Sequence, residues 1–233
     1  VELPLKFENL MLSEEDLEKN EFPKRGERIE GNEMQFPDLC EDLPRPLSRA
    51  ITSSVEMEDV DEAQQWRDAL QKFAGKEAAA LADDKCVALL RGVDCEMVLT
   101  DQGDELARIA VVDAAGRSLY DQFCVPEGKV LDYRTQYSGI TKNSLTNVKK
   151  TLKDIHVDMA HVLPADCILV GHSIENDLKS MQLSSKRVID TSVLFPHQGG
   201  HPLKNGLAWL VKEGFDTRMK RQGGHCPCQG SVV

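Results

Sequence analysis

The chain has 233 residues, with 39 acidic and 28 basic side chains, so its formal net charge is −11 at pH 7. It contains no run of about 18 apolar residues and no charged, apolar leader, which argues against a membrane span and a secretory signal. Its seven cysteines are scattered and odd in number, as is typical of buried thiols in a reducing, intracellular compartment. The length fits one ordinary domain with an extension.

The acidic excess belongs to the first part of the chain. Residues 1–85 hold 22 acids and 11 bases, whereas the remaining residues hold 17 of each and are neutral overall. The composition therefore divides the chain into an acidic N-terminal arm over 1–85 and a balanced domain over 86–233. Because the second part is balanced, it can carry a local basic groove for a nucleic acid.

The arm is predicted to be mostly irregular, because five prolines punctuate its first 50 residues. One short helix is expected just after Leu12, where Ser13 can cap the N-terminus and acids fill the first turn, and Pro23 stops it. A second, amphipathic helix is expected over 53–74, where apolar side chains recur at helical spacing until Gly75. Both should pack on the domain without supplying catalytic groups.

Three apolar runs, over 87–97, 106–113 and 118–125, are separated by short polar turns and are predicted to form consecutive antiparallel strands. A polar loop is expected over 130–141. The pattern then alternates, with a helix over 144–163, a strand over 167–170, a helix over 174–183, a strand over 187–191 and a helix over 203–214. This order is typical of an α/β fold with a ribonuclease-H-like mixed sheet.

The first of these strands is predicted to carry Asp94, Cys95 and Glu96 at its far end. Side chains alternate along a strand, so Asp94 and Glu96 should point to one side and Cys95 to the other. Two carboxylates aimed at one point repel each other unless a cation lies between them, and hard oxygen ligands favour Mg²⁺ or Mn²⁺ over zinc. The D-x-E pattern alone also fits a strand end that places two acids in water.

Five segments, in this order and at about this spacing, resemble the Rex-type RNA exonucleases of the DEDDh superfamily: VDCEM (93–97), DYRTQYSGIT (132–141), LVGHSIENDL (169–178), VIDTSVLFP (188–196) and LKNGLAWL (203–210). The resemblance covers about residues 87–231. It implies a metal-dependent 3′–5′ exonuclease that acts on single-stranded RNA 3′ ends in the nucleus or nucleolus.

The resemblance also assigns metal ligands. In this superfamily four acids from separate motifs hold two divalent ions, which clamp the attacking and leaving oxygens of a phosphoryl displacement. Asp94 and Glu96 match the first motif and Asp177 matches the second, so the complete enzyme would bind two Mg²⁺ or Mn²⁺ ions through these residues. Glu175 and Asn176, on the same helix as Asp177, are expected to face solvent.

The third motif of the family is a histidine followed shortly by an aspartate, with the histidine as general base toward the attacking water. His225 matches the histidine, but Cys226, Pro227 and Cys228 follow it and no Asp comes after. The H-C-x-C run lacks the second half of a zinc site. The fourth acid is therefore missing, and the chain is expected to be C-terminally truncated or catalytically impaired.

For the substrate, the resemblance points to Met97 beside the terminal base or sugar, Arg134 at a phosphate or ribose oxygen, and Tyr133 or Tyr137 as a stacking group. Met97 and Tyr137 could instead be packing residues. His172 could contact a phosphate or support a metal ligand, or it could be a purely structural histidine.

Asp190 is expected to be structural. Three functions stay open from the sequence: a metal-dependent 3′–5′ exoribonuclease, a catalytically impaired nuclease fold that binds RNA or protein, and a DNA 3′–5′ exonuclease. The third stays open because the metal chemistry does not depend on the sugar. The natural substrate and the oligomeric state also stay open.

Overall fold

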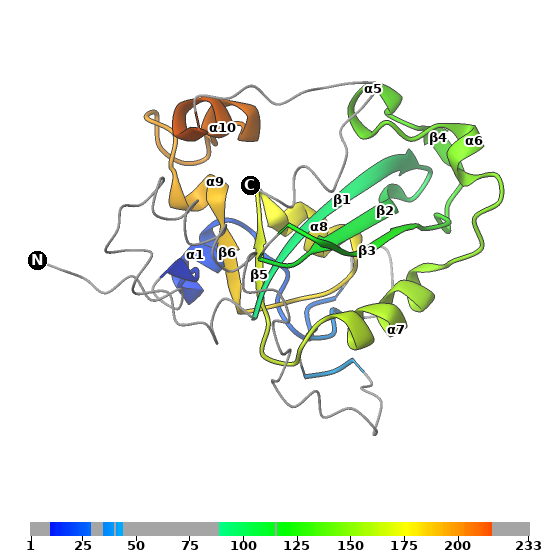
Figure 1. The fold of residues 1–233 in the computed structure, drawn as a ribbon, viewed down its shortest axis with the longest axis horizontal. Helices are drawn as coiled ribbons and strands as arrows, with labels where there is room; N and C mark the ends of the chain where they lie inside the picture. The colour runs from blue at the N-terminus through cyan, green and yellow to red at the C-terminus, as the bar shows by residue number, and fades with distance from the viewer. Residues whose placement is uncertain (1–9, 29–34, 40, 44–88, 115, 216–233) are drawn as a thin grey trace, which may run out of the picture.

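The computed structural model describes residues 10–28, 35–39, 41–43, 89–114 and 116–215. Its strands are β1 (Leu90–Thr100), β2 (Gly103–Val112), β3 (Ser118–Phe123), β4 (Val130–Asp132), β5 (Ile168–Gly171) and β6 (Val188–Asp190). They form one mixed sheet in the order β3-β2-β1-β5-β6, with β4 paired to β1 (Figure 1). β1, β2 and β3 are antiparallel, whereas β5 and β6 run parallel to β1, as the sequence predicted.

The helices are short. They are α1 (Glu14–Lys19), α5 (Thr135–Ser138), α6 (Lys142–Leu145), α7 (Leu152–Val162), α8 (Ile174–Ser180), α9 (Thr191–Leu194) and α10 (Leu207–Phe215). The Ser13 hydroxyl accepts a hydrogen bond from the Asp16 N–H at 3.1 Å and caps α1, as predicted. The continuous helix predicted over 144–163 is wrong, because Thr151 forms a reciprocal capping box with Asp154 and starts α7 as a new helix.

Two further predictions of local structure are corrected. β1 does not end beside the acids but continues to Thr100, which pairs with Gly103 across a tight turn and with Val130 of β4. The loop predicted over 130–141 contains β4 and α5. Asp94 and Glu96 consequently lie in the middle of a strand, because the ladders with β2 and β4 extend β1 beyond the point where its apolar run ends.

One face of the sheet carries the main hydrophobic core, which α7 and α8 cover. Val93 and Cys95 of β1 are buried there, and α8 contributes Ile174 and Leu178, followed by Met181 at its C-cap. Burying each such side chain contributes about 1.5–3 kcal/mol relative to leaving it exposed. The burial of Cys95 on this face places Asp94 and Glu96 on the opposite one, as strand alternation predicts.

The described residues form two small clusters that cover the opposite face at its two ends. The cluster near the start of β1 contains Leu90, Ile168 and Ile189, and the cluster near its end contains Val98, Ala107 and Ile140. Asp94 and Glu96 lie between them along β1. The middle of this face is therefore polar, and it separates two apolar patches on one strand.

The described part of the N-terminal arm, residues 10–28, 35–39 and 41–43, packs on the core. Phe22 and Leu39 are buried in the main cluster. The backbone N–H of Leu12 donates to the carbonyl of Val188 at 2.9 Å, and that of Leu39 donates to the carbonyl of Ser184 at 2.9 Å. These contacts attach the arm to β6 and to the connection that leads into it, as the predicted packing of the arm requires.

The amphipathic helix predicted over 53–74 and the boundary between 85 and 86 lie outside the described residues. Over the residues that the structure covers, no helix is both long enough and apolar enough to span a bilayer.

The burial of the arm predicts its contribution to stability. Leu39 is 1% exposed, so Leu39→Ala should leave a cavity and lower the free energy of unfolding by about 2–5 kcal/mol in a urea titration. Leu131 on β4 is 60% exposed, so Leu131→Ala should change it by less than about 0.5 kcal/mol. Equal stability of the two variants would show that the arm is not part of the folded core.

Candidate active site

The candidate site lies where β1 continues beyond the end of β5. The two strands pair only as far as Gly92 and Val170, whereas β1 stays in register with β2 through Asp94 and Ala110. Between the last pair with β5 at Gly92 and the first pair with β4 at Leu99, the backbone groups on this edge of β1 need partners other than a strand. Residues just after β5 in the sequence are well placed to supply them.

Asp177 is one such partner. It lies on α8, shortly after β5, and its Oδ1 accepts a hydrogen bond from the backbone N–H of Cys95 at 2.7 Å. Cys95 lies between Asp94 and Glu96, so this bond brings the third predicted acid to the strand segment that carries the first two. The Asp177 side chain is buried, although it is a carboxylate.

The burial of these acids has an electrostatic consequence. Burial raises the pKa of Asp177 well above its ordinary value, and the nearby charge of Asp94 raises it further. Burial also raises the pKa of the Cys95 thiol, and the charges of Asp177 and Asp94 add to that effect. Two carboxylates that repel each other at low dielectric would be stabilised by a cation between them.

Asp94 and Asp177 fit a hard cation, because Mg²⁺ commonly takes one or two protein carboxylates and completes its octahedron with water and phosphate oxygens. Within the described ranges, no group of three or more His, Cys, Asp or Glu side chains is gathered closely enough to hold an ion. Glu96 is buried on the same strand face but does not complete such a group. His225, the predicted base, lies outside the described residues.

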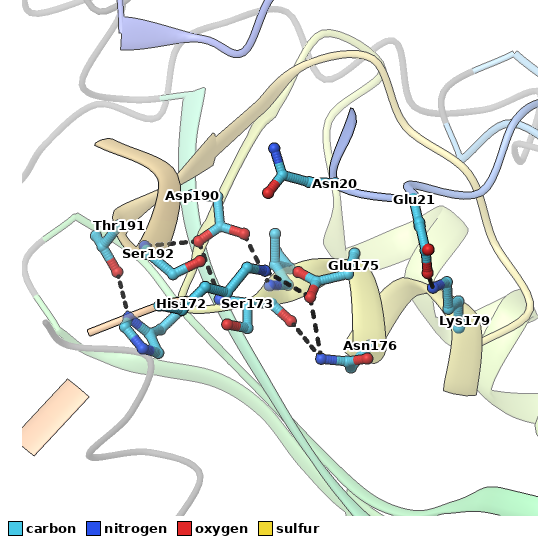
Figure 2. Close-up of polar contacts among 12 residues, drawn as sticks. Asn20, Glu21, His172, Ser173, Glu175, Asn176, Lys179, Asp190, Thr191 and Ser192 are labelled. Carbon is cyan, nitrogen blue, oxygen red and sulfur yellow. Dashed lines mark hydrogen bonds and ion pairs between the residues drawn. The ribbon is translucent and has the colours of Figure 1, made fainter. Parts of the chain in front are cut away.

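Asp190 organises the turn that leads from β5 into α8. It is fully buried, and its carboxylate accepts hydrogen bonds from the N–H groups of Ser173 (2.9 Å), Ile174 (3.2 Å) and Ser192 (2.8 Å) (Figure 2). Ser173 has a left-handed φ of 57°, and its own side chain does not cap the helix. Asp190 therefore caps α8 and holds a strained turn, which confirms its structural role.

His172 lies in the same turn. Its Nδ1 is 3.0 Å from the Thr191 hydroxyl, and that hydroxyl donates to the Gly171 carbonyl at 3.1 Å (Figure 2). Because a hydroxyl has one proton, Nδ1 must be the donor to Thr191. Burial lowers the pKa of His172, so near neutral pH the ring is uncharged.

Glu175 departs from the prediction. Asn176 is exposed as expected, but Glu175 is only 7% exposed. Its Oε1 accepts from the Lys204 ammonium at 2.6 Å and from the Asn176 side-chain amide at 3.2 Å. An acid in the first turn of a helix is favoured there by the helix dipole without any partner. The partner of Glu175 is Lys204, which is 29 residues away in the sequence, so no local pattern indicates it. Sequence reasoning therefore missed this ion pair.

The predicted substrate contacts have different surroundings. Met97 is partly buried against the main core and Tyr133 against the cluster near the end of β1, as packing residues are. Tyr137 is 71% exposed on α5, which excludes the packing alternative for it. The Arg134 guanidinium makes an ion pair with Asp104 at 2.7 Å, a contact that the sequence did not indicate.

The raised pKa of Asp177 predicts how metal-free stability depends on pH. The folded state holds the proton of this carboxyl more tightly than an unfolded chain, whose pKa is near 3.8. The contribution of Asp177 to stability should therefore be greatest at low pH and be lost as the pH rises from 3.8 toward the folded-state pKa.

The variant Asp177→Asn keeps an acceptor for the Cys95 N–H but removes the charge. In EDTA at pH 7 the variant should melt at a higher temperature than the wild type. The difference between the two melting temperatures should become smaller as the pH is lowered toward 4. Adding Mn²⁺ should raise the melting temperature of the wild type and leave that of the variant unchanged. A variant that is less stable in EDTA across this range would contradict the placement of Asp177.

Comparison with known proteins finds curated relatives that are named as RNA exonucleases. No family model matches the chain. The chain is 39% identical over 134 residues to RNA exonuclease 1 of Saccharomyces cerevisiae, which covers 57% of the chain and 24% of the relative. It is 41% identical over 136 residues to human RNA exonuclease 5, covering 58% of the chain and 18% of the relative. The chain thus spans less than a quarter of the length of these relatives.

Solved structures show the same fold. The Pan2 catalytic unit of Neurospora crassa aligns with a TM-score of 0.55 and 21% identity, over 63% of this chain and 26% of that one. The Pan2 module of Saccharomyces cerevisiae, solved with AAGGAA RNA, aligns with a TM-score of 0.54 and 19% identity, over 62% and 27%. These likenesses show the ribonuclease-H-like fold. Over the region that it shares with those relatives, the chain is similar to curated RNA exonucleases.

Proposed function

We propose that this chain is a metal-dependent 3′–5′ exoribonuclease that hydrolyses phosphodiester bonds at single-stranded RNA 3′ ends. The observation that carries the proposal is the hydrogen bond from the Cys95 N–H to Asp177, which brings this acid to the strand segment that carries Asp94 and Glu96. The names of the curated relatives support the choice of RNA and of exonucleolytic cleavage.

Asp94 and Asp177 are the residues that would hold Mg²⁺ or Mn²⁺, with Glu96 on the same strand face as a further acid. When bound, such ions activate water and stabilise the charge on the attacking and leaving oxygens of an in-line displacement. Two ions are the expectation for the complete site, since a pair clamps both oxygens. Without a metal ion the carboxylates repel one another, and a bound cation would relieve that repulsion.

The rest of the chain fixes these ligands in place. Asp177 is held by the Cys95 N–H, and Asp190 holds the turn from which α8 begins. His172 is held in that turn by its hydrogen bond to the Thr191 hydroxyl. Such rigid support matters because a displacement of about 1 Å in a catalytic group can cost about a hundredfold in rate.

Binding without cleavage is the second candidate function. It is favoured by the finding that, among the described residues, three ligating side chains do not gather into a metal cluster. A DNA 3′–5′ exonuclease would use the same metal chemistry and differ only in the contact to the sugar. A single assay distinguishes the exoribonuclease from a binding protein and from a DNA exonuclease.

The assay uses the full chain with a single-stranded RNA labelled at its 5′ end, in Mn²⁺. Stepwise shortening from the 3′ end is expected, with little cleavage of the matching DNA. Asp94→Ala should slow the reaction by at least about a hundredfold, because it removes a ligand of the reaction centre. Glu127→Ala, which removes an exposed acid from the connection between β3 and β4, should leave the rate unchanged.

Three results would contradict the proposal. RNA binding without shortening would support the binding function instead. Equal cleavage of DNA would remove the specificity for RNA. Undiminished activity of Asp94→Ala would show that β1 does not carry the reaction.

A further inference from the structure

The sheet face that carries Asp94 and Glu96 also carries a cation. Arg108 lies on β2, between β1 and β3 (Figure 1), and is directly opposite Glu96 in the antiparallel ladder. Residues that face each other in such a ladder point to the same side of the sheet, with Cβ atoms about 4.5–5.5 Å apart. The next residue of β2, Ile109, is buried in the main core, which places Arg108 on the opposite face. The register therefore puts a basic side chain beside the acids of β1.

Strand β3 fixes the guanidinium group of Arg108. Its Nε donates to Oδ1 of Asp121 at 2.8 Å, and its Nη2 donates to Oδ2 of the same carboxylate at 2.7 Å. The guanidinium also lies over the ring of Phe123, 5.2 Å from the ring centroid. Phe123 is opposite Arg108 on β3 and packs against the cluster near the end of β1. One carboxylate and one aromatic ring thus hold the guanidinium on the β3 side of β2.

Stability alone gives little reason for this arrangement. The side chains of Arg108 and Asp121 are 21% and 30% exposed, and a pair that is accessible to water contributes at most about 1 kcal/mol. Arginine carries five N–H donors in a planar fork, and the contact with Asp121 takes two of them. A guanidinium can therefore contact a carboxylate and a phosphate at the same time. Its partial exposure makes it accessible to a ligand on this face.

The spacing of the strands sets the distance between the cation and the acids. Neighbouring strands are about 4.8 Å apart, so a guanidinium held toward β3 is roughly 5–10 Å from β1. This separation keeps the arginine outside the place that a metal ion would take between carboxylates. A nucleic acid strand carries a phosphate on every nucleotide. A strand that meets a metal ion at Asp94 would therefore present a further phosphate over the same face.

We propose that Arg108 is a substrate-binding residue whose guanidinium, held by Asp121 and Phe123, donates to an RNA phosphate next to the one at the acids of β1. This proposal rests on the exoribonuclease function and adds a contact to it. The carboxylates of this face repel a polyanion, and an arginine on the neighbouring strand offsets that repulsion at short range. Arginine suits this role because its planar fork matches two phosphate oxygens and is already oriented.

The test measures the binding of a single-stranded RNA to the full chain by fluorescence anisotropy as a function of salt concentration. Ca²⁺ replaces Mg²⁺ so that cleavage is suppressed. Each contact of a basic side chain with a phosphate of a single strand contributes about 0.7 to the slope of log K against log salt. Arg108→Met should weaken binding at low salt and reduce this slope by about 0.7. Arg108→Lys should keep most of the slope, because it keeps the charge.

A double variant separates phosphate binding from a purely structural ion pair. Arg108→Met alone leaves the carboxylate of Asp121 without its cation, whereas Arg108→Met combined with Asp121→Asn removes both charges. The double variant should regain thermal stability and still show the reduced slope. Its net charge equals that of the wild type, so a change in net charge would not account for the smaller slope.

Arg117→Met is the matched control. Arg117 donates through Nε to Asp113 at 2.7 Å, so it is also an arginine that is paired with an aspartate. It lies in the turn after Val112, and at about 3.4 Å per residue Val112 is roughly 14 Å along β2 from Arg108. The slope of this variant should equal that of the wild type.

The outcomes are distinct. A wild-type slope in the double variant, or an equal loss of slope in Arg117→Met, would overturn the role of Arg108 while leaving the exoribonuclease function intact. A wild-type chain that neither binds nor shortens RNA would instead overturn the proposed function itself.

Discussion

One hydrogen bond, from the Cys95 N–H to the Asp177 carboxylate, holds the candidate site together. It exists because β1 is longer than its parallel neighbour β5, which leaves a backbone donor on β1 beyond the last paired residue. A strand would satisfy that donor with a neutral carbonyl. A carboxylate from the next helix satisfies it instead, and so places negative charge beside Asp94. The geometry of the sheet thus brings two carboxylates close together, and a metal ion between them would offset their repulsion.

The turn between β5 and α8 is under strain, and the fold compensates for it with buried polar contacts. Ser173 in a left-handed conformation costs about 1–3 kcal/mol, and the three N–H groups bound by Asp190 offset this cost. The same turn holds His172 through Thr191. Strain that is held by a buried carboxylate makes the start of α8 rigid, which fixes where Asp177 lies.

The buried charges are distributed unevenly around α8. Leu178 and its neighbours at helical spacing pack into the core, while Asp177 and Glu175 flank that apolar stripe and are buried as well. Asp177 meets a backbone amide and Glu175 meets a lysine. A short helix therefore carries an apolar contact to the core and two polar contacts to different parts of the chain, which makes it the centre of the site.

The sequence alone determined the fold class and the positions of the principal acids. Short polar turns required antiparallel strands, alternation put Asp94 and Glu96 on one face, and the Ser13 cap started α1 where expected. It could not determine where β1 ends or that α7 begins at a new cap, because ladder pairing and a competing capping box decided these points. It also could not determine that Glu175 is buried against Lys204 or that Arg134 meets Asp104. Such contacts join residues far apart in the chain, and only the tertiary structure brings their charges together.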